Sequence, residues 1–86
     1  MISSNNDLYT TVQALSNELK KAGEQRWSAA LDDAMTISTV PGEILGEIRL
    51  QLQLLRATQI PTRLDMNSRI DEALSYLDQI LGSSSL

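Results

Sequence analysis

The chain has 86 residues, a formal net charge of −4 and a pI near 4.5, and it contains no cysteine and no histidine. A chain of this length makes one domain. Disulfides and the usual zinc sites are excluded, so the fold must depend on aliphatic packing, alone or together with self-association. The acidic balance makes nucleic acid an unexpected partner, because phosphate backbones repel a surface of the same sign.

No segment carries the signature of an exported protein or of a membrane protein. The first residues, from Met1 to Asp7, lack the basic and apolar regions of a signal peptide. No apolar run approaches the roughly 20 residues needed to cross a bilayer. We therefore expect a cytoplasmic protein that makes no contact with a membrane.

The first half of the chain predicts two helices, over residues 7–22 and 24–38, because apolar residues recur there every three or four positions. The Ser and Asn residues before the first helix offer N-caps, and Gly23 suits its C-terminus. We expect Trp27 to anchor the core between the two helices. The apolar face of the first helix consists of Leu8, Val12, Leu15, Leu19 and Ala22, and that of the second of Trp27, Ala30, Leu31, Ala34 and Met35.

A third helix is expected over residues 41–58, because Pro41 favours a helix start. It carries two apolar stripes. The main stripe consists of Ile44, Leu45, Ile48, Leu52 and Leu55, and the second of Gly46, Leu50, Leu54 and Ala57. Glu43 and Glu47 separate the stripes along one edge, and Arg49 and Arg56 along the other. A helix that is apolar on two sides is either central in its bundle or partly committed to a partner.

The fourth helix is expected over residues 65–81, followed by a flexible tail at residues 82–86. Ile60-Pro61 ends the third helix, because a residue before proline avoids the helical region. Either Asp65 or Ser68, the latter paired with Asp71, offers the N-cap. Gly82 ends the helix. Its apolar face consists of Ile70, Ala73, Leu74, Leu77, Ile80 and Leu81.

These elements predict an all-α fold, a small antiparallel bundle of three to four helices joined by short connectors. We expect the third helix at the centre of this bundle. Its residues Ile44, Ile48, Leu52 and Leu55 would then face the other helices.

The residues available for catalysis and ligand binding are few. Without His or Cys, the commonest general base and the strongest metal ligands are missing. Adjacent carboxylates such as Asp32 and Asp33 diverge by about 100° on a helix and cannot converge on one substrate atom. We expect no enzymatic activity, no cofactor, no metal and no small-molecule substrate.

A glycine of the third helix, and an arginine series that runs from this helix into the following connector, each allow a structural and a functional interpretation. Gly46 either lets another backbone of the same chain come close, which we favour, or forms a notch that admits a partner helix. Arg49, Arg56 and Arg63 recur every seven residues. They either pair with neighbouring carboxylates, which is the more common arrangement, or bind an acidic partner.

The sequence therefore favours a non-catalytic protein–protein interaction module. Its partner is another protein or a second copy in a homodimer. The expected partner-binding residues are Gly46, Leu50, Leu54 and Ala57. Whether the bundle buries this second stripe stays open.

The alternative is an immunity-like or antitoxin-like protein that neutralises a basic partner by electrostatic attraction. Its candidate contacts are Asp32, Asp33, Asp71, Glu72 and Asp78.

Overall fold

The computed structural model describes residues 2–82, and this part of the chain folds into four longer helices and one short helix. They are α1 (Asn5–Lys21), α2 (Gln25–Thr36), α3 (Pro41–Arg56), α4 (Ile60–Arg63) and α5 (Asn67–Leu81). The longer helices begin and end within two residues of the expected ranges, and the all-α prediction is confirmed. Of the expected tail at residues 82–86, all but Gly82 lies outside the described residues.

Local side chains and one glycine set the ends of α1. The Ser4 hydroxyl accepts a hydrogen bond from the Asp7 backbone N–H at 3.1 Å, as an N-cap does. At the other end, Gly23 has a φ of +86°. The N–H of Glu24 donates to the Leu19 carbonyl at 2.8 Å, and the N–H of Gly23 to that of Lys20 at 3.2 Å. This pair of bonds is the Schellman motif, which turns the chain sharply into α2.

The connector between α3 and α5 differs from the expectation. Ile60 and Pro61 begin the short helix α4, because proline is tolerated in the first turn, where its missing N–H costs no hydrogen bond. Asp65 does not cap α5. It has a φ of +58° and occupies the left-handed position that ends α4, where the Met66 N–H donates to the Pro61 carbonyl at 2.7 Å.

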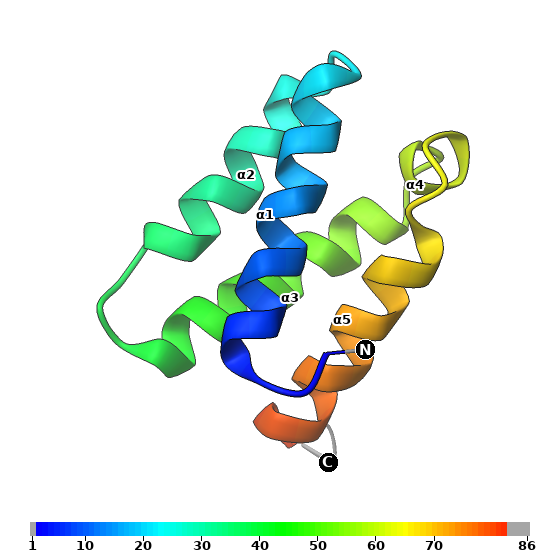
Figure 1. The fold of residues 1–86 in the computed structure, drawn as a ribbon. Coiled ribbons are helices and arrows are strands. Elements are labelled where there is room, and N and C mark those ends of the chain that lie inside the picture. Colours follow the sequence, from blue (N-terminus) through cyan, green and yellow to red (C-terminus); the bar gives the residue numbers. More distant parts are fainter. Residues whose placement is uncertain (1, 83–86) are drawn as a thin grey trace.

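The four longer helices form a closed ring around the core. α1 packs against α2 and α5, and α3 packs against α2 and α5 (Figure 1). Within the described residues, the backbones of α1 and α3 lie on opposite sides of the core and do not touch. The third helix is therefore one wall of the ring and not its centre, whereas Ile48, Leu52 and Leu55 face the shared core as expected. A helix in a ring of four needs one apolar face only, and this leaves the second stripe of α3 outside.

The core is aliphatic, and the buried polar residues among those described are Ser16 and Ser28. The first, third and fifth helices bury most of their expected stripes, with five exceptions: Ala22 is exposed, Ile80 is 43% exposed, and Ile44, Leu74 and Leu81 are half-buried. Trp27 is half-buried and packs against the core, as expected of an anchor. The buried apolar side chains are Leu8, Val12, Leu15, Leu19, Leu31, Ala34, Leu45, Ile48, Leu52, Leu55, Met66, Ile70, Ala73 and Leu77.

None of the helices within residues 2–82 combines the length and the apolar character required to cross a membrane.

Candidate interaction surface

The residues expected to bind a partner lie on the side of α3 that points away from the core. Leu50 is 46% exposed and Leu54 is 49% exposed, whereas Ile48 and Leu52, their neighbours on the same helix, are fully buried. At 100° per residue, Leu50 and Leu54 point almost opposite to Ile48 and Leu52. We call Gly46, Leu50, Leu54 and Ala57 the outer face of α3. The other helices of the bundle do not bury its two leucines.

Gly46 is half-buried on this outer face, yet no part of the described chain requires a glycine there. A Cβ built on Gly46 would meet no atom within 4 Å outside its own helix backbone. The favoured interpretation, that Gly46 admits another backbone of the same chain, is therefore wrong. Glycine in a helix interior costs about 0.5–1 kcal/mol relative to alanine. Nothing within the fold offsets this cost.

The arginines along the basic edge of the outer face are neutralised by aspartates of the same chain. Arg49 pairs with Asp78 at 2.8 Å, and Arg56 pairs with Asp71 through two hydrogen bonds of 2.8 and 3.3 Å. Both pairs join α3 to α5, and the seven-residue spacing is the same on each helix. This register fixes α3 and α5 as antiparallel neighbours. The bond to Arg56 also lowers the pKa of the Asp71 carboxyl.

The acidic edge has no such compensation within the described residues. Glu43 accepts a hydrogen bond from the Ser38 hydroxyl at 2.6 Å, and Glu47 accepts one from the Gln51 amide at 2.9 Å. Neither forms an ion pair with the side chains of residues 2–82. Glu43 also lies in the first turn of α3, where the helix dipole favours a carboxylate. The outer face is thus apolar, with a negative border at its N-terminal half.

Two further ion pairs hold other parts of the bundle together. Arg63, the third arginine of the seven-residue series, pairs with Glu24, so the series is structural throughout. Arg69 of α5 forms two bonds with Glu18 of α1, and this interaction lowers the pKa of the Glu18 carboxyl.

Most carboxylates of the alternative, acidic binding surface already have internal partners. Asp71 and Asp78 are held by arginines, and Glu72 accepts a hydrogen bond from the Ile2 N–H at 3.0 Å. Asp32 accepts one from Ser16 at 2.7 Å. Only the side chain of Asp33 lacks a polar partner within residues 2–82. A basic partner would have to compete with these contacts, so the alternative gains no support.

A buried polar connection between α1 and α2 was not predicted from the sequence. The hydroxyls of Ser16 and Ser28 are 2.8 Å apart, both residues are buried, and Ser16 also donates to Asp32. Two small side chains let the helices approach closely, and the chain of hydrogen bonds satisfies both hydroxyls. The serine at position 16 next to Leu15 could have been noticed, but its direction depends on the rotation of α1 in the fold.

Three exposed apolar side chains were also missed or misplaced. Ile37 and Val40, in the connector before α3, are 58% and 51% exposed, and Ile80 of α5 was expected to be buried. Single exposed apolar residues are common in soluble domains. The outer face differs from them because two leucines lie one turn apart beside a glycine that the fold does not use.

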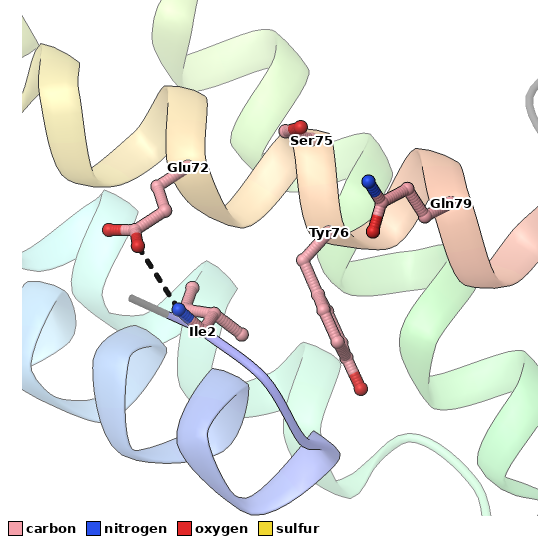
Figure 2. Close-up of a pocket in the computed structure, with 5 residues that line it drawn as sticks. All are labelled: Ile2, Glu72, Ser75, Tyr76 and Gln79. Atoms are coloured by element: carbon pink, nitrogen blue, oxygen red, sulfur yellow. Dashed lines mark hydrogen bonds between the residues drawn. The ribbon is translucent and has the colours of Figure 1, made fainter.

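A hollow of about 280 Å³ lies between the start of the chain and α5, lined by Ile2, Glu72, Ser75, Tyr76 and Gln79. Figure 2 shows Glu72 turned toward the Ile2 N–H, with Tyr76 extending along the other side of Ile2. The Tyr76 hydroxyl donates to Asn5 at 2.6 Å. These groups fasten the N-terminal segment to α5. In the part of the chain that is described, no three acidic side chains gather to hold a metal ion.

Comparison with known proteins returned no match: no family model, no curated protein and no solved structure is similar to this chain.

Proposed function

We propose that the protein is a non-catalytic interaction module that binds a protein partner through the outer face of α3. The observation that carries the proposal is the half exposure of Leu50 and Leu54 beside Gly46. Burying these leucines against a partner would remove apolar surface from water, which is the dominant favourable term in most protein association. The glycine would let the partner approach the α3 backbone. We expect the module to work in the cytoplasm.

The proposal is tested by replacing both leucines with glutamate. Leu50→Glu/Leu54→Glu places two carboxylates in the apolar contact, where their desolvation opposes binding. Both side chains are half exposed, so the fold should tolerate the change. The matched control is Gln13→Glu/Asn17→Glu, which adds the same two charges with the same four-residue spacing at exposed positions of α1.

The measurement is capture from the source cell by the tagged wild type and by both variants, with the bound chains, including untagged copies of this protein, identified by mass spectrometry. We expect the wild type and the control to retain the same specific partner and the leucine variant to lose it. Equal retention by all three would refute the outer face as a binding surface.

A further inference from the structure

The side chains along the outer face of α3 have nearly the same order of sizes in both directions. From the N-terminal end they are small, large, large and small: Gly46, Leu50, Leu54 and Ala57. The spacings are four, four and three residues. A surface that reads the same in reverse can pair with itself about a two-fold axis, because such an axis makes each contact occur twice.

An antiparallel pair of α3 helices brings complementary sizes together. With the two-fold axis midway between Leu50 and Leu54, Leu50 lies opposite Leu54 of the second copy, and Leu54 opposite its Leu50. Gly46 then lies within about one residue of Ala57 of the second copy, at both ends of the contact. Two small residues let the backbones come close enough for the leucines to touch. This arrangement gives Gly46 the close neighbour that it lacks among residues 2–82 of its own chain.

The charges at the borders favour the antiparallel direction over the parallel one. Glu43 and Glu47 are nine and five residues from the two-fold axis, so two antiparallel copies hold their Glu43 carboxylates about 27 Å apart and their Glu47 carboxylates about 15 Å apart along the helices. These separations are beyond three and nearly two Debye lengths at physiological salt. In a parallel pair each carboxylate would lie at the same height as its counterpart. The helix dipoles also oppose each other favourably in the antiparallel pair.

In the antiparallel pair, the basic edge of one copy lies beside the basic edge of the other, which would place arginines near arginines. Asp78 and Asp71 remove this repulsion, because they neutralise Arg49 and Arg56 within each copy. The ion pairs between α3 and α5 therefore prepare the edge for self-association as well as joining the helices.

From this combination of shape and charge, we infer that the partner of the outer face is a second copy of the chain, with the two α3 helices antiparallel about a two-fold axis near residue 52. The inference rests on the proposed function, since it names the partner for the same surface. One helix of 16 residues is about 24 Å long, and a single helix pair buries less than the roughly 1,200 Å² of the smaller stable interfaces. We expect a dissociation constant between about 10 µM and 1 mM.

The first experiment measures the mass of the purified chain by sedimentation from about 5 µM to about 2 mM, a range that brackets the expected dissociation constant. The wild type should rise from 9.5 kDa toward twice that mass. Leu50→Glu/Leu54→Glu should raise the dissociation constant at least about 100-fold, and Gln13→Glu/Asn17→Glu should leave it within about threefold.

The second experiment determines the relative direction of the two α3 helices by disulfide cross-linking. No other disulfide can form, because the chain has no native cysteine. An antiparallel pair should cross-link a mixture of Glu47→Cys and Ala57→Cys, and neither variant alone, because identical positions lie about 15 Å apart along the helices, far beyond disulfide reach. A parallel pair would give the opposite pattern. A third variant, Gln13→Cys, reports random collision.

The outcomes separate the two proposals. A wild type that stays at 9.5 kDa at the highest concentration overturns self-pairing, whatever else the outer face binds. If capture from the cell then still depends on Leu50 and Leu54, the partner is a different chain and only the further inference fails. A dimer that survives Leu50→Glu/Leu54→Glu would overturn self-pairing through the outer face, and the capture experiment would then decide the proposed function by itself. Cross-links at identical positions would overturn the antiparallel direction.

Discussion

Gly46→Ala tests whether the glycine of the outer face is an internal requirement of the fold. A methyl group added at Gly46 meets no atom within 4 Å outside its own helix backbone, so no steric cost opposes it. Alanine favours a helix interior over glycine by about 0.5–1 kcal/mol. For a domain of this size, each kcal/mol shifts the melting temperature by about 4–8 °C. We therefore expect Gly46→Ala to raise the melting temperature of the monomer by about 2–8 °C.

The assay is thermal and urea unfolding at a few micromolar, where the monomer dominates, followed by circular dichroism and by the fluorescence of Trp27, the single tryptophan. Gly23→Ala is the control. Gly23 has a φ of +86°, so a side chain there is strained and the free energy of unfolding should fall by about 1–2 kcal/mol.

A lower stability of Gly46→Ala in the monomer would refute the reasoning, because it would mean that the fold itself needs the glycine. Self-pairing through the outer face has a second consequence for the same variant. Because the added methyl groups separate the paired backbones, Gly46→Ala should weaken the dimer while it stabilises the monomer. A purely structural glycine would move both quantities in the same direction.

Three more predictions follow from the bundle. Leu52→Ala should cost about 2–5 kcal/mol in urea unfolding, since it empties a buried site, whereas Leu54→Ala on the same helix should cost less than about 1 kcal/mol; equal losses would contradict the orientation of α3. Asp65→Gly should raise the free energy of unfolding by about 0.5–1 kcal/mol, because glycine adopts the φ of +58° without strain; no gain would mean that the Asp65 side chain compensates for its backbone. Glu18→Gln should destabilise the fold at pH 7 by at most about 1 kcal/mol, because the pair with Arg69 is partly exposed. Since Arg69 lowers the pKa of Glu18 below its ordinary 4.5, this difference should be complete above pH 4.5 and disappear as the pH falls through the folded pKa; a difference that persists at pH 2 would contradict it.

The helices could be predicted from the sequence because each is amphipathic over several turns. The stripe from Leu8 to Leu19 has one possible inner face, and burial followed the pattern. α3 was different, since both of its stripes are apolar: the main stripe was predicted to face the core, but local periodicity cannot say whether the second stripe is buried as well. That choice depends on how many neighbours α3 has, which the closed ring of helices decides.

Other parts of the structure depend on contacts between segments far apart in the chain. The Ser16–Ser28 contact requires a particular rotation of α1 against α2, and the sequence does not encode that rotation locally. The positive φ of Asp65 arises because α4 must end and α5 begin within three residues. The candidate surface itself could be predicted as a set of residues, while its exposure could not.

Binding through the outer face is tested most directly by NMR spectra of the labelled chain, followed residue by residue as the chain is diluted. We expect the amide signals from Gly46 to Ala57 to shift with concentration and those of the α1 face around Gln13 to stay unchanged. Leu50→Glu/Leu54→Glu should show no such shifts. Shifts spread over the whole chain, or confined to another face, would contradict the claim that this surface of α3 is where the protein binds.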